Sequence, residues 1–233
     1  MNTIVITAID KKGSNISKYA STCISSWENW CKKNNVSLHI FEKDEFIHPK
    51  FAFLSIFEKL NANKIIHVDL DTLIHPQTPN LFELYDDIFT VVKDSGRVDY
   101  EISQRMIRGV NSFEGTFHSF NLDKSKYFNS GMMMFNKSHS IFLSEAKNWI
   151  ESNYSKIVKW SSAGDTGLDQ TPFNWLVQKN NIETNFLDIR YNRTGLLKNN
   201  LDINDNFIIH FRGLKTNRKI KLMKELNDYL VGL

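Results

Sequence analysis

The chain of 233 residues has few cysteines, and their spacing does not suit a disulfide. Its two cysteines, Cys23 and Cys31, lie in one segment with a helical pattern. Their separation of eight positions spans about 12 Å along a helix axis, which is too far for a disulfide bond. We therefore expect two reduced thiols, which are typical of proteins in a reducing compartment such as the cytoplasm.

Long apolar runs and blocks of positive charge are also missing. No run reaches the length of a membrane-spanning helix, and no basic segment precedes the apolar residues at the N-terminus. We therefore expect neither a membrane span nor a signal peptide. The formal net charge is only +3 without a polybasic tract, which argues against a nucleic-acid partner. A small anionic ligand would account for the surplus of Lys and Arg equally well.

No internal repeat or low-complexity linker divides the chain, so we expect one domain. Apolar patterns predict strands at 4–9, 36–41 and 64–73, an ordered segment at 127–136, and short strands at 184–187 and 207–211. Helical patterns occupy 17–33, 51–60, 141–152 and 170–179. Because strands and helices alternate, we expect an α/β fold with a mainly parallel central sheet flanked by helices.

Three further segments have their own character. Residues 94–126 mix Gly, Ser, Asn, Arg and aromatic residues without a clear period and predict a long irregular excursion, such as a lid or a binding loop. A turn-rich loop is expected at 161–167. Residues 218–233 predict an amphipathic helix, which we expect to pack on the sheet rather than lie on an anionic membrane; its apolar stripe consists of Leu222, Met223, Leu226 and Leu230.

Two carboxylates, Asp69 and Asp71, follow the apolar run that begins at Lys64. Residues i and i+2 of an extended segment point the same way, so both carboxylates could face one cation. Carboxylates are unfavourable at the end of a buried strand unless their charge is compensated, and Mg²⁺ or Mn²⁺ would compensate it. The alternative is that the pair merely ends the strand at the solvent edge.

Four short motifs follow one another along the chain: Val68-Asp69-Leu70-Asp71, Phe128-Asn129-Ser130-Gly131, Asp169-Gln170-Thr171-Pro172-Phe173-Asn174, and His210-Phe211-Arg212-Gly213-Leu214-Lys215. In this order they resemble the motifs of nucleotide-sugar glycosyltransferases with the GT-A fold. The resemblance is to retaining enzymes of the family 8 type and to their relatives in families 34 and 77. It extends from the first predicted strand to about Lys215.

The resemblance implies a metal site and a phosphate site. Asp69, Asp71 and His210 would bind Mn²⁺ or Mg²⁺ against the diphosphate of the donor, where a metal stabilises the negative charge of the leaving group. His210 alone could instead be an ordinary buried histidine. Gly213 would let the backbone approach the phosphates, and Lys215 would contact them. The family pattern places this lysine one position later, so Arg212 and Arg218 are alternatives for the role.

The resemblance also implies a nucleotide site and a sugar site. The nucleotide and its phosphates would contact Thr7, Ala8, Asp10, Lys50 and Leu70, besides Asp69. The donor sugar would contact Asn129, Ser130, Gly131, Asp169 and Gln170. Asp169 and Gln170 would also be catalytic, because the Gln170 carboxamide could stabilise an oxocarbenium-like charge. Without the resemblance, Asp169 could be the N-cap of the following helix, Lys50 a solvated lysine and Asp10 an ordinary loop residue.

The function implied is metal-dependent transfer of a sugar, with retention of configuration, from a UDP-sugar or another nucleotide-diphosphate sugar to a hydroxyl of a glycan or other acceptor. Residues 1–93 would bind the nucleotide, 94–217 the sugar and acceptor, and 218–233 would form the C-terminal helix. An inverting enzyme would need a carboxylate base, for which the candidates are Asp99, Glu101, Glu114 and Asp165. A sugar-phosphate nucleotidyltransferase and a non-catalytic sugar-nucleotide-binding protein are further alternatives. A nucleotidyltransferase would need a Gly-rich phosphate loop after the first strand, where the segment 7–14 has one Gly.

Overall fold

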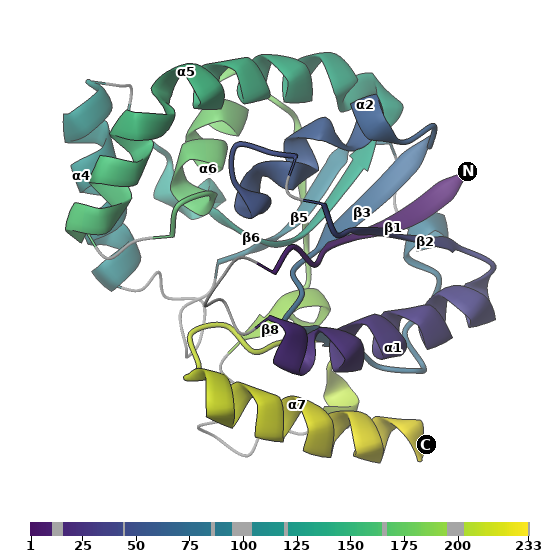
Figure 1. The fold of residues 1–233 in the computed structure, drawn as a ribbon. Coiled ribbons are helices and arrows are strands. Elements are labelled where there is room, and N and C mark those ends of the chain that lie inside the picture. Colours follow the sequence, from purple (N-terminus) through teal and green to yellow (C-terminus); the bar gives the residue numbers. More distant parts are fainter. Residues whose placement is uncertain are drawn as a thin grey trace.

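A central sheet of six strands organises the protein (Figure 1), with the strand order β2-β1-β3-β6-β5-β7. β1 pairs in parallel with β2 and β3, β5 pairs in parallel with β7, and β6 runs antiparallel between β3 and β5. Five strands therefore share one direction, which confirms the mainly parallel α/β sheet. The strands are β1 (Asn2–Thr7), β2 (Ser37–Phe41), β3 (Lys64–Val68), β5 (Phe89–Lys93), β6 (Phe128–Asn136) and β7 (Thr184–Leu187).

The computed structural model describes residues 1–10, 16–43, 45–84, 87–94, 104–118, 121–164, 167–194 and 203–232. Its α-helices are α1 (Ser17–Asn34), α2 (Ile56–Lys59), α3 (Leu81–Leu84), α4 (Gln104–Phe117), α5 (Ser140–Gly164), α6 (Gln170–Lys179) and α7 (Thr216–Val231). The 3₁₀ helices are η1 (Pro49–Ser55), η2 (Lys124–Lys126), η3 (Lys137–His139), η4 (Ile189–Asn192) and η5 (Ile203–Asp205). A second sheet has the order β4-β9-β8, from β4 (Thr72–Ile74), β9 (Ile208–His210) and β8 (Arg193–Thr194).

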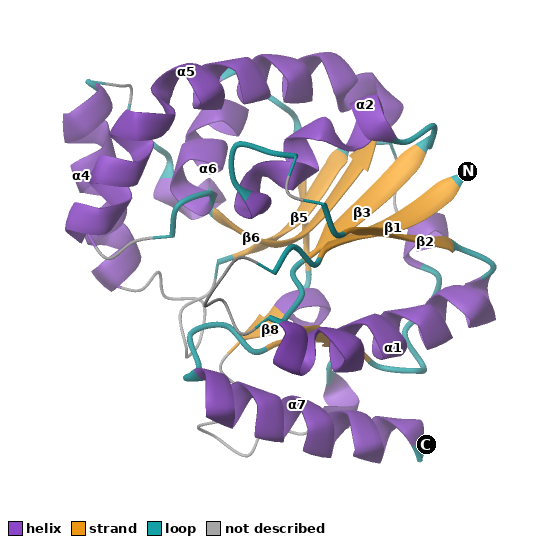
Figure 2. Cartoon of the chain, viewed as in Figure 1, coloured by secondary structure: helices purple, strands orange, loops and turns teal. Residues whose placement is uncertain are grey.

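Helices cover both faces of the central sheet (Figure 2). α2, α4, α5 and α6 lie on one face, whereas α1 lies on the other with α7 outside it. Alternate side chains of a strand enter the two cores, as the two-residue period of a strand requires. Val5 of β1 belongs to the core beneath α5, and its neighbours Ile4 and Ile6 belong to the core beneath α1. β6 is buried along its whole length because both of its faces are covered.

Three sequence-based expectations about the elements were wrong. The predicted helix at 51–60 is mostly a 3₁₀ helix that begins at Pro49, where the His48 side chain accepts a hydrogen bond from the Lys50 amide. The predicted excursion at 94–126 contains α4, and residues 95–103 of that segment lie outside the described part. α5 runs on to Gly164, through most of the loop predicted at 161–167, because Ile157 and Trp160 continue its buried face.

The acidic-ended strand and the C-terminal helix also depart from expectation. The predicted strand at 64–73 is two strands, since β3 ends at Val68 and the chain turns before β4. α7 packs against α1 rather than directly on the sheet, and its Met223, Leu226 and Leu230 are buried there. Both cysteines are free and buried. Within the described ranges, no helix combines the length and apolarity needed to cross a bilayer.

Candidate active site

The turn between β3 and β4 carries the two aspartates, and hydrogen bonds fix its backbone. The Asp69 amide donates to the Gly131 carbonyl of β6 (2.9 Å), and the Phe211 amide donates to the Asp71 carbonyl (2.9 Å). Thr72 Oγ1 donates to the Asp69 carbonyl (2.7 Å) and accepts from the buried Trp27 indole N–H (3.0 Å). The turn is therefore held by β6, by α1 and by the segment that follows β9.

His210 joins the two aspartates although it lies far along the chain. β4 and β9 pair antiparallel with Thr72 opposite His210, so the register places the imidazole beside the turn. His210 Nε2 lies 3.1 Å from an Asp71 carboxylate oxygen and 3.4 Å from an Asp69 carboxylate oxygen. The ligand atoms of the three residues all lie within 4.8 Å of one another. Two carboxylates and an imidazole at these distances could together hold a divalent metal ion.

The two aspartates have different electrostatic surroundings. Burial raises the pKa of Asp71, but the neighbouring His210 and Lys219 outweigh it and hold this pKa below its usual range. The pKa of Asp69 is raised, first because the protein around the cavity shields this carboxyl from bulk water and also because Asp71 and Asp169 are close, although His210 and Lys50 oppose the rise. A cation bound here would therefore stabilise the ionised form of Asp69 more than that of Asp71, which is already stabilised by its neighbours.

A hydrogen-bonded group of polar side chains lies beside the aspartates. The Gln170 amide N–H donates to Asp94 (2.7 Å), and Gln170 Oε1 accepts from Asn129 (3.1 Å). Arg212 donates to the other Asp94 oxygen (2.9 Å) and to Gln170 Oε1 (3.5 Å). These bonds fix the orientation of the Gln170 carboxamide.

Asp169 precedes α6, but its side chain makes no capping hydrogen bond. It accepts instead from Ser130 Oγ (2.7 Å) and lies 3.6 Å from the Lys50 ammonium. Asp169 therefore occupies the N-cap position without capping the helix through its side chain. Lys50 is half-exposed and directed at this carboxylate, with a pKa raised mainly by Asp169.

A cavity of about 480 Å³ brings most of the predicted site residues together. Gly213, with a φ of 73° that glycine adopts without strain, lies at its wall. The predicted residues that line the cavity are Thr7, Lys50, Asp69, Leu70, Asp71, Asn129, Ser130, Asp169, Gln170, His210 and Gly213. Residues that the sequence-based reasoning did not name also line it, among them Tyr19, Asp94, Met106, Tyr127 and Lys219.

Four predicted residues do not line this cavity. Ala8 continues the pairing of β1 by donating to the Phe41 carbonyl, and Asp10 is exposed beyond it. Gly131 lies behind His210, where an added Cβ would come within 2.3 Å of the imidazole. Lys215 is exposed just before α7. Lys219, one helical turn later, is ion-paired with Asp71 instead.

The signals for the residues that were missed differ. Asp94 directly follows β5, and a carboxylate after a strand of a parallel sheet is a recognisable signal for that edge. Of the candidate bases for an inverting enzyme, Glu114 accepts a hydrogen bond from the Leu122 amide (2.5 Å) and does not line the cavity. Asp99, Glu101 and Asp165 lie outside the described residues.

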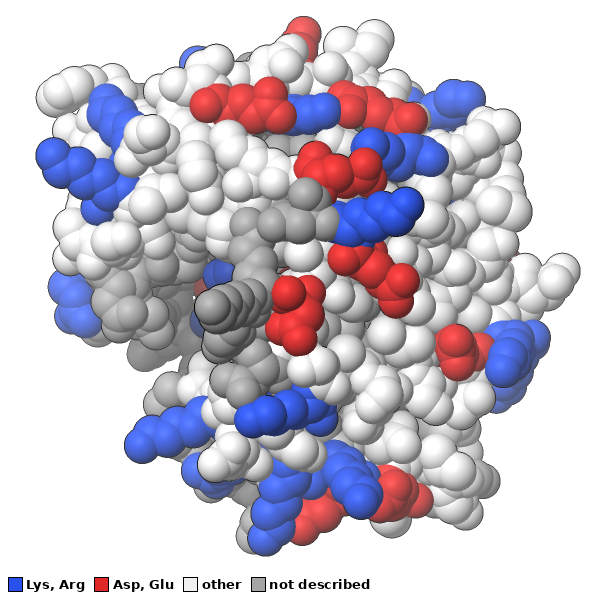
Figure 3. Space-filling model, viewed as in Figure 1, with Lys and Arg blue, Asp and Glu red and all other residues white. Residues whose placement is uncertain are grey.

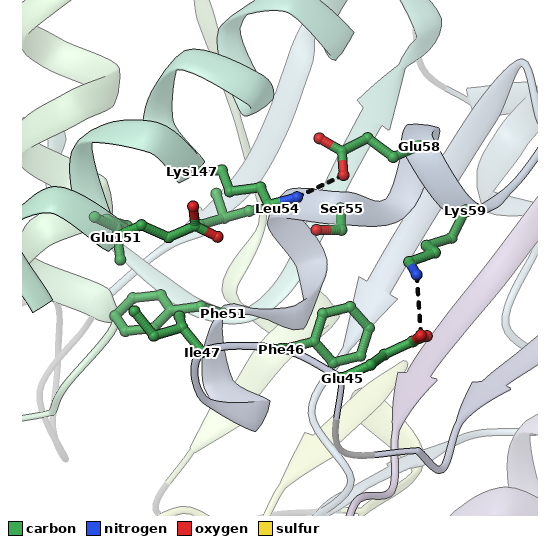
Figure 4. A pocket seen from close by; sticks show the side chains of 11 residues that line it. Glu45, Phe46, Ile47, Phe51, Leu54, Ser55, Glu58, Lys59, Lys147 and Glu151 are labelled. Atoms are coloured by element: carbon green, nitrogen blue, oxygen red, sulfur yellow. Dashed lines mark hydrogen bonds and ion pairs between the residues drawn. The ribbon is translucent and has the colours of Figure 1, made fainter.

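A second cavity of about 160 Å³ lies between η1, α2 and α5 (Figure 4). Its apolar lining consists of Phe46, Ile47, Phe51, Leu54 and Ile150. Its charged rim is largely paired: Lys147 contacts Glu58 at 2.6 Å, and Lys59 contacts Glu45 at 3.0 Å. In the part of the chain that the structure describes, the acidic group with metal-ligand spacing is in the larger cavity. We therefore assign the active site to the larger cavity.

Comparison with solved structures supports the same fold. A glycosyltransferase involved in glycosylation of the major capsid of PBCV-1 aligns with a TM-score of 0.63 and 12% identity over 96% of this chain and 98% of that one. The galactosyltransferase LgtC, in complex with donor and acceptor sugar analogs, aligns with a TM-score of 0.54 and 14% identity over 97% of this chain and 95% of that one. Mouse xyloside xylosyltransferase 1 aligns with a TM-score of 0.51 and 13% identity over 91% of this chain and 98% of that one. At these identities the likeness shows the GT-A fold alone.

No curated protein matches the chain at the level of sequence. A family model does match: that of glycosyl transferase family 8, over residues 5–217. This match covers most of the chain and includes all four motifs. The chain therefore belongs to glycosyltransferase family 8 and is a glycosyltransferase with the GT-A fold.

Proposed function

We propose that this glycosyltransferase uses a divalent cation, Mn²⁺ or Mg²⁺, to transfer a sugar from a nucleotide-diphosphate donor, with UDP-sugars favoured, to a hydroxyl of a glycan or other acceptor. The observation that carries the proposal is the convergence of Asp69, Asp71 and His210 on one cavity with Asp169 and Gln170. The LgtC structure with donor and acceptor sugar analogs supports this substrate class.

Asp69, Asp71 and His210 would hold the cation, which supplies Lewis-acid stabilisation of the leaving diphosphate. Lys219 lines the same cavity and is the nearest described cation to Asp71, so we assign it the diphosphate contact that the sequence had suggested for Lys215. A lysine acts on phosphate as a point charge. Lys50 also lines the cavity, beside Asp169.

The sugar would lie between the aspartates and the Asn129–Gln170 pair. The Gln170 carboxamide is fixed by Asp94, Asn129 and Arg212, so its dipole needs no reorganisation when positive charge develops at the anomeric carbon. Ser130 and Lys50 orient the Asp169 carboxylate toward the same space.

Retention is supported by the pairing of the carboxylates. Among the described residues that line the cavity, each Asp already contacts a basic side chain: Asp69 contacts His210, Asp71 contacts Lys219, Asp94 contacts Arg212, and Asp169 contacts Lys50. None is placed as a ready general base. In a same-face displacement, the bond from the anomeric carbon to the phosphate oxygen breaks, the acceptor oxygen bonds to that carbon, and the leaving phosphate takes the acceptor proton.

A thermal-shift screen of nucleotides with Mn²⁺ tests the proposal. A ligand present at 100 times its dissociation constant stabilises the folded state by about 2.7 kcal/mol, which is readily measured. We expect UDP to raise the melting temperature with Mn²⁺ more than with EDTA. Asp71→Asn should abolish most of the metal-dependent part, and an unchanged shift in this variant would remove Asp71 from the metal site. The anomeric configuration of the product, measured by NMR, tests retention separately.

A further inference from the structure

We propose that Asn192 is a positioning residue, which sets the tautomer of His210 for metal binding and ties this ligand to Gln170 through a directional chain of hydrogen bonds. The proposal rests on the proposed function, because it takes His210 as a metal ligand. Asn192 belongs to none of the four sequence motifs.

The first link joins Asn192 to the imidazole. Asn192 Oδ1 lies 3.0 Å from His210 Nδ1, and both side chains are buried, with 3% and 4% of their surfaces exposed. A carboxamide oxygen can only accept, so Nδ1 carries the proton. With the proton of Nδ1 committed to Asn192, Nε2 is the nitrogen left to bind a metal, and it is the atom that faces Asp69 and Asp71. A partner of this kind fixes the tautomer and the ring orientation of a metal-binding histidine.

The second link leaves from the other end of the same carboxamide. Asn192 Nδ2 donates to Asn129 Oδ1 (2.8 Å), which also accepts from the Gly131 amide (2.9 Å). Asn129 Nδ2 then donates to Gln170 Oε1 (3.1 Å). Every amide in the chain accepts on one side and donates on the other. A flipped Asn192 would place its NH₂ against the protonated Nδ1 and its oxygen against the Asn129 oxygen, so the sequence of bonds has one consistent direction.

The series of hydrogen bonds ends at the charged pair of Asp94 and Arg212. Gln170 Nε2 donates to Asp94 Oδ2 (2.7 Å), and Arg212 donates to Asp94 Oδ1 (2.9 Å). The metal ligand His210 is thereby connected to Gln170 through two buried asparagines, and the last amide is anchored on an ion pair. A shift of Asn192 would therefore disturb both the proposed metal site and the orientation of Gln170.

The fold holds Asn192 in place from both sides. It is the last residue of η4, which begins with the Asp188 side chain accepting from the Arg190 amide (2.9 Å). β8 follows at once and pairs in parallel with β9, placing Thr194 opposite His210. Gly131 provides the space, since a Cβ there would lie 2.6 Å from His210 Nδ1 and 2.8 Å from Asn129 Oδ1.

Mn²⁺ affinity of the free protein, titrated by EPR without any nucleotide, tests the assignment. Loss of a hydrogen-bond partner behind a metal ligand weakens metal binding by roughly 10–100-fold, and we expect this for Asn192→Ala. Asn192→Asp keeps an acceptor for Nδ1 and should bind Mn²⁺ within a few-fold of the wild type. Asn136→Ala is the matched control, because Asn136 is a buried asparagine at the far end of β6 and should leave Mn²⁺ affinity unchanged.

Two results would overturn the assignment: wild-type Mn²⁺ affinity in Asn192→Ala, or an Asn192→Asp variant that binds as weakly as Asn192→Ala. If Asn192→Ala does not fold, NMR of the wild-type protein still tests the assignment through the tautomer of His210. With ¹⁵N-labelled histidine and Mg²⁺, His210 should show a protonated Nδ1 and a non-protonated Nε2, and the opposite tautomer would exclude the role. A wild-type protein that binds neither metal ion would instead contradict the proposed function itself.

Discussion

Asp69 and Asp71 are two positions apart, yet their side chains have different surroundings in the site. The Asp71 side chain is 15% exposed and contacts both His210 and Lys219, whereas the Asp69 side chain is 42% exposed and faces the cavity. Asp71 is therefore the anchored carboxylate and Asp69 the one open to a ligand. A short Asp-x-Asp pattern does not reveal this difference, because it arises from α7 and β9.

Lys219 forms an ion pair with Asp71, the carboxylate that the proposed metal ion would also bind. Replacing it with Met should tighten Mn²⁺ binding to the free protein several-fold, because Asp71 loses a competing cation. The same change should weaken UDP binding in the presence of Mn²⁺ by about tenfold or more, since a hydrogen bond to a charged group contributes roughly 1.5–3 kcal/mol. Isothermal titration calorimetry with Mn²⁺ and then with UDP measures both effects.

Lys221→Met is the control for this variant. Lys221 lies on the same helix, and its largely exposed side chain pairs only loosely with Glu225, at 3.7 Å. It should alter neither affinity. Unchanged UDP affinity in Lys219→Met would exclude Lys219 from the diphosphate contact.

The elements around the site depend on close packing as much as on charge. β6 passes directly behind His210, and Gly131 is the point of closest approach. The turn after β3 is held against the same residue by the hydrogen bond from the Asp69 amide to the Gly131 carbonyl. A side chain at this position would therefore push on the imidazole and on Asn129 together.

Gly131→Ala should weaken Mn²⁺ binding by at least about tenfold, because the added methyl group would displace the His210 imidazole from its position as a metal ligand. Gly115→Ala is the matched control, because a Cβ at Gly115 in α4 would meet no atom within 4 Å. The control should keep its Mn²⁺ affinity and gain about 0.5–1 kcal/mol in free energy of unfolding, since Gly is a poor helix former. Mn²⁺ titration and urea denaturation together check both variants. Normal Mn²⁺ affinity in Gly131→Ala would contradict the steric argument.

Most of the strands and helices could be predicted, because apolar runs and helical periods are local features of the sequence, but β5 and α4 were not. α4 was missed because its buried residues Met106, Val110 and Phe113 are interspersed with Gly, Asn and Ser, which are poor helix formers. Packing against α5 and α6 overrides those propensities. A one-dimensional pattern does not contain this contribution.

The motif residues could be predicted because the family resemblance marks them, but their partners could not. Asn192 reaches His210 only through the register of β8 on β9. Lys219 reaches Asp71 because the helix begins after Lys215, which places the side chain one turn later toward the site. Sequence reasoning chose Lys215 from its distance to Gly213, without knowledge of where the helix begins.

The molecule as a whole is stabilised by two cores, and the one under α5 is rich in aromatic residues. Phe173 of α6 lies at its centre, with ring contacts to Phe53 at 4.7 Å and to Phe142 at 5.9 Å. Phe173→Ala should lower the free energy of unfolding by about 3–5 kcal/mol, as large-to-small changes in cores do. Urea denaturation measures this loss. Ile141→Ala, at a side chain 72% exposed on α5, should change stability by no more than about 0.5 kcal/mol, and a comparable loss there would contradict the location of the core.

The outer surface of α7 carries most of the charge near the C-terminus. Figure 3 shows Lys and Arg side chains gathered at the lower edge of the molecule, with a few acidic side chains among them. The exposed basic residues of this region are Lys215, Arg218, Lys221 and Lys224. Met223, Leu226 and Leu230 of α7 are buried and the helix packs against α1, so these apolar side chains are not available to a membrane.

The family assignment replaces the nucleotidyltransferase and binding-protein hypotheses with a glycosyltransferase. What it leaves to experiment is the metal, the donor and the stereochemical course. The proposed function places metal and donor in the same cavity, so one type of assay can address both directly.

That assay is release of nucleotide from a panel of nucleotide sugars, measured with Mn²⁺, with Mg²⁺ and with EDTA. The proposed function predicts that a UDP-sugar is turned over with a divalent cation, that EDTA stops the reaction, and that Asp71→Asn shows almost none of it. Turnover that continues unchanged in EDTA and in Asp71→Asn would contradict the assignment of Asp69, Asp71 and His210 as the metal site.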